Sequence, residues 1–219
     1  MKWSWSAYDA YNTCPKKFWH TKVARDVVEP AGEAALWGTR VHEALEYAVR
    51  DEAPLPEGMP WGPLAAKLRA TSGTIHCEMK LAIDKSLKPV AFDAEEYWQR
   101  GIVDFAAVNG KRAIALDYKT GRRKLTDQLK LMALDLFAHN EELQEVYTGF
   151  VWLKEGSRID QERYERKDVV ALWRGFLPRL GQMAQSYELD LWPAKPSGLC
   201  RQWCPVTSCS YNGNYRRGT

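Results

Sequence analysis

Apolar residues recur at helical spacing in several stretches of the chain. The clearest stretch, 34–50, predicts an amphipathic helix. Its apolar stripe consists of Val41, Leu45, Ala48 and Val49. Further runs of the same period predict helices over 64–70, 126–139 and 167–187. The segment 51–63 is dense in proline and glycine and predicts a loop.

Segments with alternating or β-branched residues lie between these helices and predict strands. They cover 75–83, 100–108, 111–119 and 145–154. The second and third are joined by Asn109-Gly110, a dipeptide typical of two-residue hairpin turns. Because helices and strands interleave around an antiparallel hairpin, the sequence predicts a mixed α/β fold.

The predicted hairpin carries two acidic side chains and a lysine on one face. If the Asn-Gly pair forms the centre of the turn, Asp104 lies opposite Ala115 and diagonal to Asp117. Diagonal neighbours have backbones about 7–8 Å apart, so the two carboxylates can converge on one ion. Lys119 lies two residues beyond Asp117 and shares its face.

The other face of the hairpin is almost wholly apolar, so we expect it in the core and the acidic face exposed to solvent. The apolar residues are Val103, Phe105, Ala107, Ile114, Leu116 and Tyr118.

Oxygen ligands on this hairpin suit a hard divalent cation such as Mg²⁺ or Mn²⁺. Asp104, Asp117 and the backbone carbonyl of Tyr118 would supply them. Such an ion lowers the pKa of a bound water, and Lys119 would orient the hydroxide or stabilise a pentacovalent phosphate. An isolated Asp-x-Lys is more often a solvated surface motif. Here Asp104 interrupts an apolar strand, and Gly121 with a basic run follows at once.

Net charge is only +3 and the isoelectric point is near 8.5, so any phosphate-binding charge must be local. The best local candidate is the run Arg122, Arg123 and Lys124. A composition of 45% hydrophobic residues over 219 positions is enough for one sizeable core. No apolar run reaches the length of a membrane span, and no signal peptide is recognisable. We therefore expect a cytoplasmic protein, in a bacterial cell or a phage-infected host.

Three motifs together, GIVDF, LDYKTG and DQLKL, resemble those of the PD-(D/E)XK nuclease superfamily. The similarity is greatest to its RecB-like branch, which includes CRISPR-associated exonucleases and phage recombination nucleases, and it extends over 6–209. It implies a restriction-endonuclease-like fold, in which helices flank a mixed β-sheet core. It also implies a metal-dependent DNA nuclease with Asp104, Asp117 and Lys119 as catalytic residues.

The resemblance assigns roles to further residues. The pattern GTRVH implies that His42 is a metal ligand, although a lone histidine is usually a partly buried structural residue. Gln128 would contact the DNA phosphate or the catalytic lysine, unless it is only a polar residue at a helix start. Glu78 matches a glutamate often seen before the hairpin and would support the metal site. Met132 stands where the branch often has a tyrosine.

Four cysteines match the positions of an iron–sulfur site in some RecB-like nucleases. They are Cys14, Cys200, Cys204 and Cys209. The resemblance implies a [4Fe–4S] cluster, although the C-x3-C-x4-C spacing departs from the usual C-x2-C-x5-C. Zinc or free thiols are the alternatives. Within a single nuclease domain over 1–219, the cysteine-rich tail 192–219 would pack near the N-terminal segment 1–33.

The predicted function is an exonuclease that prefers single-stranded DNA or DNA ends. Aromatic residues near the N-terminus, including Trp3, Trp5 and Tyr8, would supply stacking surfaces for bases unless they belong to the core. A non-catalytic DNA-binding scaffold and an RNA-acting nuclease are the alternatives.

Overall fold

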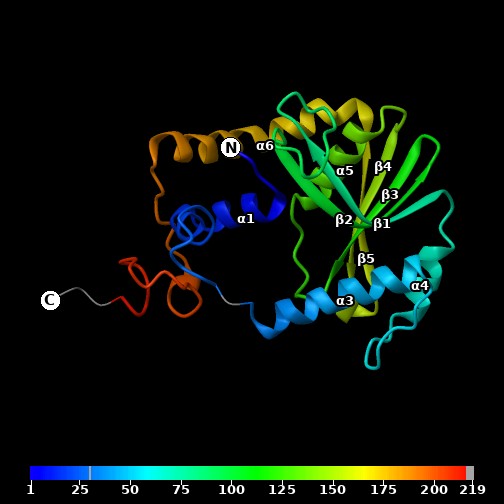
Figure 1. The fold of residues 1–219 in the computed structure, drawn as a ribbon, viewed down its shortest axis with the longest axis horizontal. Helices are drawn as coiled ribbons and strands as arrows, with labels where there is room; N and C mark the ends of the chain where they lie inside the picture. The colour runs from blue at the N-terminus through cyan, green and yellow to red at the C-terminus, as the bar shows by residue number, and fades with distance from the viewer. Residues whose placement is uncertain (30, 216–219) are drawn as a thin grey trace. The chain divides into compact units, whose positions relative to one another are not determined.

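A computed structural model describes residues 1–29 and 31–215 of the chain. It divides into two compact units, one formed by Ala31–Trp173 and the other by Met1–Pro30 together with Arg174–Thr219. Figure 1 shows the course of the chain. No helix among the described residues is long and apolar enough to cross a membrane. The expectation of one nuclease domain over 1–219 stays a prediction.

The unit of residues 31–173 is built on a five-stranded mixed sheet in the order β1-β2-β3-β4-β5. The strands are β1 (Thr74–Ile83), β2 (Gln99–Asn109), β3 (Arg112–Lys119), β4 (Glu145–Trp152) and β5 (Arg158–Glu165). Neighbours are antiparallel except β3 and β4, which are parallel and joined through helix α5 (Gln128–His139). The predicted α/β class, a mixed sheet flanked by helices, is confirmed.

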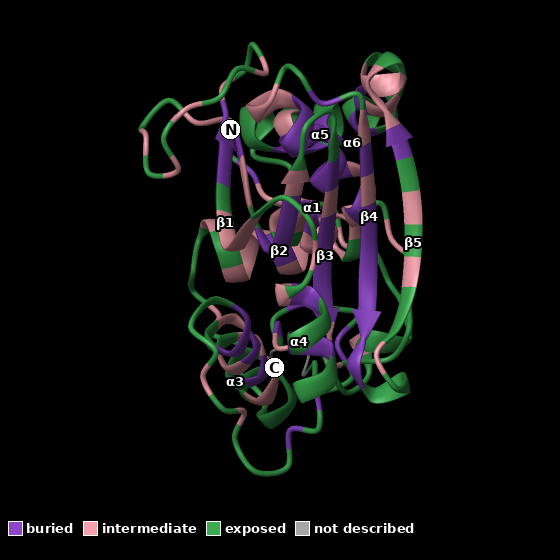
Figure 2. Ribbon diagram, turned by 90° about the vertical axis from the view of Figure 1, so that its right-hand side faces the viewer, coloured by how far each residue is buried: buried purple, intermediate pink, exposed green. Residues whose placement is uncertain are grey.

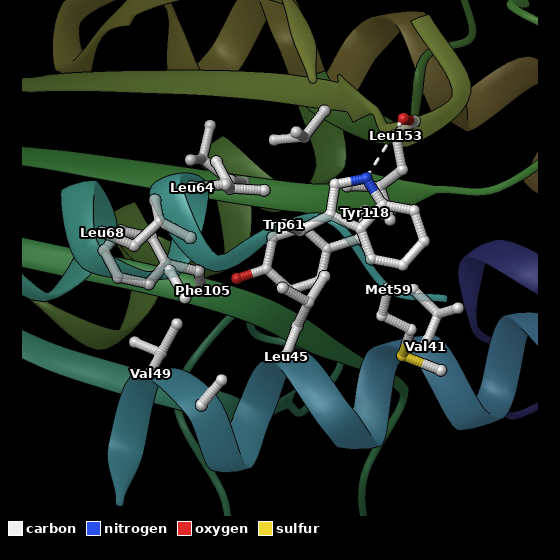
Figure 3. Close-up of a cluster of buried hydrophobic side chains, with 14 of the residues drawn as sticks. Val41, Leu45, Val49, Met59, Trp61, Leu64, Leu68, Phe105, Tyr118 and Leu153 are labelled. Carbon is white, nitrogen blue, oxygen red and sulfur yellow. Dashed lines mark hydrogen bonds between the residues drawn. The ribbon is translucent and has the colours of Figure 1, made fainter. Parts of the chain in front are cut away.

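Helices α3 (Glu33–Arg50) and α4 (Gly62–Arg69) pack on one face of the sheet. The predicted stripe of α3 is buried there, against Phe105 and Tyr118 from the strands (Figure 3). Trp61, at the start of α4, donates its indole hydrogen to the Leu153 carbonyl at 3.2 Å. This contact satisfies the polar atom of a large buried ring.

The turn between β2 and β3 differs from the predicted one by a two-residue shift in register. Asn109 pairs with Arg112, so the central turn residues are Gly110 and Lys111. Gly110 has φ +56° and Lys111 has no positive φ, as in turns that need glycine only at their first central position. The predicted pairing of Asp104 with Ala115 is therefore wrong: Ala115 pairs with Ala106. The even shift keeps the apolar residues from Phe105 to Tyr118 on their predicted face, but Val103, which was predicted on that face too, packs in the layer of α5.

The face expected to be exposed is a second core layer. Ala106, Ala113 and Ala115 pack there against Leu129 and Leu136 of α5. Asp104 and Asp117 are accordingly buried, with 7% and 6% of their surface exposed. The prediction of a solvent-exposed acidic face was wrong because the parallel β3–α5–β4 connection lays a helix over that face. Figure 2 shows β3 and β4 buried along most of their length.

Strand β5 was not predicted from the sequence. Its residues, RIDQERYE, are mostly charged, and only Tyr164 is buried. The strand lies at the edge of the sheet, where charged side chains protect unpaired backbone groups from association. Because most side chains of this edge strand are exposed, the strand lacks the alternation of apolar and polar residues that marks a half-buried strand. The sequence pattern therefore did not predict it.

The second unit combines both ends of the chain. It contains α1 (Trp5–Thr13), α2 (Pro15–Phe18), a short π-helix (Trp19–Val23) and the part of α6 (Val169–Leu189) that follows Trp173. Trp3 and Tyr8 are buried, and the Tyr8 ring meets the edge of Phe176. These two rings are therefore core residues, and the suggestion that they stack with bases was wrong.

Candidate active site

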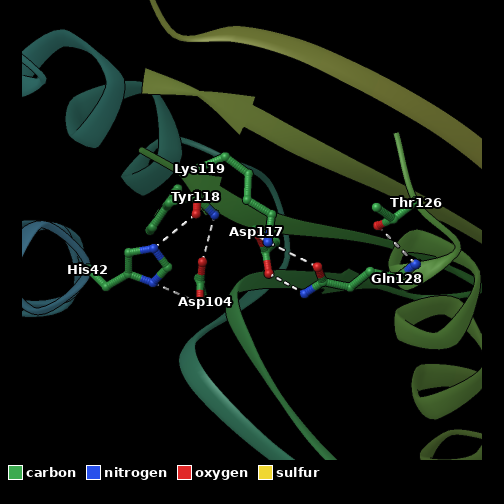
Figure 4. A network of polar contacts seen from close by, with 7 residues as sticks. All are labelled: His42, Asp104, Asp117, Tyr118, Lys119, Thr126 and Gln128. Atoms are coloured by element: carbon green, nitrogen blue, oxygen red, sulfur yellow. Dashed lines mark hydrogen bonds and ion pairs between the residues drawn. The ribbon is translucent and has the colours of Figure 1, made fainter. Parts of the chain in front are cut away.

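Strands β2 and β3 separate at the point where they carry their acidic residues. Their backbone pairing ends at Phe105 and Leu116. Beyond that pair, the Asp104 carboxylate accepts a hydrogen bond from the backbone nitrogen of Tyr118 at 2.6 Å. Extrapolation of the observed register past its last pair would set Asp104 opposite Asp117 and not diagonal to it, as had been predicted. Figure 4 shows the two acids next to each other between α3 and α5.

Asp117, Lys119 and Gln128 form one hydrogen-bonded network. The Lys119 ammonium lies 2.6 Å from Asp117 Oδ2 and donates to Gln128 Oε1 at 2.9 Å. Gln128 Nε2 donates to Asp117 Oδ1 at 2.6 Å. The glutamine, on the first turn of α5, thus holds both the acid and the lysine in place. Lys119 is half-buried, so its ammonium remains partly open to a ligand.

His42 reaches the same place from α3. Its Nε2 donates to the Tyr118 carbonyl at 2.9 Å, and its Nδ1 lies 3.3 Å from Asp104 Oδ1. Burial opposes the charged imidazolium, but the hydrogen bond to Asp104 and the charges of Asp104 and Asp117 outweigh it and raise the pKa of His42. His42, a predicted ligand, thus lies between the Asp104 carboxylate and the Tyr118 carbonyl, which was the other predicted ligand.

Glu78 has a more central place than the sequence suggested. Cys77 and Met79 pair with Phe105 and Val103, but Glu78 drops out of the ladder and has φ +49°. A positive φ is unfavourable for a non-glycine residue and persists only where the surrounding fold imposes it. On either side of this kink the side chains change face, since Cys77 packs with the α3 layer and Met79 with the α5 layer.

The kink brings Glu78 to His42 and Asp104. One ligand atom from each of these residues lies within 4.8 Å of the others. Burial, and then the charge of Asp104, raise the pKa of Glu78 to about 7. Burial and the same charge raise the pKa of Asp117 to about 6, against the opposing effect of Lys119. Crowded carboxylates with raised pKa values are typical of a place that a cation would stabilise.

The donor set of one imidazole nitrogen and several carboxylate oxygens fits Mg²⁺ or Mn²⁺. His42, Glu78 and Asp104 are near enough to share one ion, and Asp117 is held beside them by Lys119 and Gln128. Sequence reasoning gave Glu78 a lesser role because its position opposite Asp104 depends on a register that no motif encodes.

The basic run after β3 is only partly available to a ligand. Arg123 forms two hydrogen bonds with the Asp160 carboxylate, at 2.5 and 2.8 Å. Asp160 also accepts a hydrogen bond from the Trp152 indole at 2.7 Å. Arg122 and Lys124 are exposed. The ion pair thus fixes the middle residue of the run, and its two neighbours face solvent.

The unit formed by the chain ends brings the four predicted cysteines to one small cavity. Cys14, Cys200, Cys204 and Cys209 all line it. Backbone nitrogens donate to two of the sulfurs, from Lys195 to Cys14 and from Ser197 to Cys200, each at 3.4 Å. Among the described residues, no three cysteine sulfurs lie within 4.8 Å of one another.

Comparison with known proteins bears on the site as a whole. The family model that matches this sequence is that of the PD-(D/E)XK nuclease superfamily, over residues 2–209. No curated protein matches the chain. Among solved structures, the crystal structure of SSO0001 is similar at 13% identity, covering 82% of this chain and 75% of that one, with a TM-score of 0.35. A likeness at that score carries no argument about function.

Proposed function

Because the chain belongs to the PD-(D/E)XK nuclease superfamily, we propose that it is a Mg²⁺- or Mn²⁺-dependent deoxyribonuclease with its active site on β2 and β3. The observation that carries this proposal is the convergence of His42, Glu78 and Asp104 within 4.8 Å, beside the network of Asp117 and Lys119.

We assign metal binding to His42, Glu78, Asp104 and Asp117, with the Tyr118 carbonyl as a further ligand. A divalent ion bound there would supply a water of lowered pKa and neutralise charge on the phosphate. The Lys119 ammonium then stabilises the negative charge that develops on the phosphate in the transition state.

Gln128 keeps Lys119 pointing at that phosphate, because its amide bonds to both Lys119 and Asp117.

The substrate we propose is DNA, cleaved from an end and preferentially as a single strand. Arg122 and Lys124, exposed just after β3, would contact the phosphate backbone near the site. The first alternative is a DNA-binding scaffold without catalytic activity. Such a scaffold would not need the contact between Asp117 and Lys119, so we rank it below the nuclease. Cleavage of RNA by the same residues is the second alternative, and a substrate panel separates it from cleavage of DNA.

Cleavage assays with Asp117→Asn test the proposal directly. We expect the wild type to degrade labelled single-stranded DNA in Mn²⁺ or Mg²⁺ and to be inactive in EDTA. Asp117→Asn should lose this activity, because it removes a carboxylate that the metal and Lys119 both use. The exposed residue Asp93 provides a matched control, Asp93→Asn, which should retain full activity. Inactivity of the wild type on single-stranded DNA, duplex DNA and RNA alike would refute the assignment.

We further propose that the chain belongs to the RecB-like branch and that its four cysteines bind a [4Fe–4S] cluster. Their common cavity and the two N–H···S bonds support this proposal. Lys16, Lys17 and Lys195 line the same cavity. Anaerobically purified protein should contain about four iron atoms per chain, as expected for such a cluster, and Cys204→Ser should lose them. Colourless protein that contains zinc would refute this part.

A further inference from the structure

A cavity of about 520 Å³ lies in the unit formed by the two ends of the chain. Its walls come from three segments: the C-terminal half of α6, the end of α1 with Pro15, and the chain that follows α6 as far as Lys195. Lys195 also lines the cysteine cavity, but among residues 1–29 and 31–215 no cysteine and no residue of the candidate active site lines this larger one. Its size is within the range of about 300–1,000 Å³ that is usual for small-molecule sites.

The polar groups of this cavity favour an anion. Arg179 and Lys195 both line it, and none of the described residues that line it is acidic. Lys195 uses one of its three N–H groups to bind the Asn12 carbonyl at 2.7 Å, and an ammonium has two more to offer. Arg179 offers a planar guanidinium, which binds phosphate with two parallel hydrogen bonds.

The other walls suit a flat ring with a polar edge. Leu189, Leu191 and Pro193 provide apolar surface, whereas Gln182 and Gln185 each provide an amide that both donates and accepts hydrogen bonds. A ligand with an anionic group, an apolar face and a hydrogen-bonding edge satisfies all these walls at once. An anion without a ring would leave the apolar surface and the amides unused.

The cavity is held open by a buried contact between α1 and α6. The Tyr11 hydroxyl donates to the Gln182 carbonyl at 3.0 Å and lies 2.8 Å from Ser186 Oγ. Tyr11 also packs against the buried residues Phe18 and Met183. A preformed wall reduces the ordering cost of binding.

We propose that this cavity binds one nucleoside monophosphate unit, with the phosphate on Arg179 and Lys195 and the base against the glutamine amides. The choice of a nucleotide rests on the proposed nuclease function, since hydrolysis of DNA releases this chemical group. The site itself shares no residue with the active site. The unit is either a free mononucleotide or the terminal nucleotide of a strand.

Binding measured in EDTA on the full chain carrying Asp117→Asn tests the proposal without cleavage or a metal. A deoxynucleoside 5′-monophosphate, a short single-stranded oligonucleotide, inorganic phosphate and the unphosphorylated nucleoside are titrated by calorimetry. We expect the mononucleotide to bind, with the oligonucleotide showing whether a strand end binds better. The phosphate and the nucleoside alone should bind at least about tenfold more weakly, because each uses only part of the cavity.

Arg179→Ala should weaken nucleotide binding at least about tenfold, because it removes the charge-assisted hydrogen bonds of the guanidinium to the phosphate. Arg174→Ala is the matched control, an exposed arginine on the same helix outside the cavity, and should bind as the parent does. Gln185→Leu, which alters one of the amides that line the cavity, should weaken the mononucleotide but not inorganic phosphate.

No binding of either nucleotide ligand would overturn the proposal, and so would binding unchanged in Arg179→Ala. Equal affinity for inorganic phosphate and the mononucleotide would overturn the nucleotide assignment. DNA hydrolysis by the wild-type chain is measured separately: a chain that cleaves DNA but binds no nucleotide here refutes this site alone, and a chain that binds the nucleotide but cleaves no nucleic acid refutes the nuclease assignment alone.

Discussion

Replacement of Asp135 by asparagine should stabilise the protein at neutral pH. Asp135 lies on α5 with 3% of its surface exposed, and its Oδ2 accepts one hydrogen bond from Gln99, at 3.1 Å. Gln99 is itself completely buried. Burial raises the pKa of Asp135 to about 8, and the hydrogen bond from Gln99 opposes this only in part. The folded protein therefore carries a protonated carboxyl at pH 7.

The sign of the pH dependence follows from this raised pKa. In the unfolded chain the carboxyl ionises near its ordinary pKa of about 4. Between about pH 4 and pH 8 the unfolded state gains charge that the folded state cannot accept, so the stability contributed by Asp135 falls as pH rises. At 1.36 kcal/mol per pH unit, the loss between pH 4 and pH 7 is about 4 kcal/mol as an upper limit.

The substituted amide in Asp135→Asn would keep the acceptor for Gln99 and would have no proton to lose. Urea unfolding from pH 4.5 to pH 8 should thus show Asp135→Asn gaining stability over the wild type, by about 2–4 kcal/mol at pH 7. The exposed control Asp93→Asn should follow the wild type at every pH. A difference between Asp135→Asn and wild type that does not change with pH would refute the reasoning.

Three further substitutions test the active site and the core. Gln128→Leu should lower kcat about 10–100-fold by releasing Lys119 and Asp117, and steady-state kinetics that show an unchanged kcat would contradict this role. Leu45→Ala should cost about 2–5 kcal/mol in urea unfolding, because Leu45 is fully buried, and a cost near zero would contradict the packing. Gly149→Ala should cost about 1–3 kcal/mol in the same assay, since a Cβ there would meet Ile159 Cγ2 at 3.0 Å; unchanged stability would contradict the close approach.

Much of the architecture could be predicted from the sequence because local periodicity is strong where elements are long. The helix over 34–50 and the strand over 145–154 were predicted to within two residues of α3 and β4. Asn109-Gly110 located the hairpin, but the dipeptide could not show whether glycine takes the first or the second central position of the turn. That ambiguity alone produced the two-residue error in register.

Burial on both faces of a strand was harder to predict. Ala106, Ala113 and Ala115 are small, and alanine on a strand is equally compatible with a solvated face or a helix packed closely above it. Only the parallel pairing of β3 and β4 brings α5 over these residues. The pairing is long-range information, and it converts the acidic pair from a surface feature into a buried site.

The position of Glu78 beside His42 and Asp104 depends on a backbone kink that the amino-acid sequence does not predict. The left-handed φ of Glu78 interrupts the alternation of side chains between the two faces of β1. The sequence of β1 therefore shows only a weak strand pattern. His42 was easier to place, since it lies on the buried side of α3, one turn before Leu45. The acidic motif of β2 and β3 could thus be predicted from local sequence, whereas the position of Glu78 beside it required the fold.

Mn²⁺ binding at the site of His42, Glu78 and Asp104 is the most direct test of the whole account. Calorimetric titration of the wild-type chain should give one or more Mn²⁺ sites, and His42→Ala together with Glu78→Gln should weaken the tightest of them at least about tenfold. Glu43→Gln, an exposed neighbour on α3, should bind as the wild type does. Loss of affinity with loss of DNA cleavage in the same variants is the predicted result. Full Mn²⁺ affinity and full cleavage after both ligand substitutions would contradict the account.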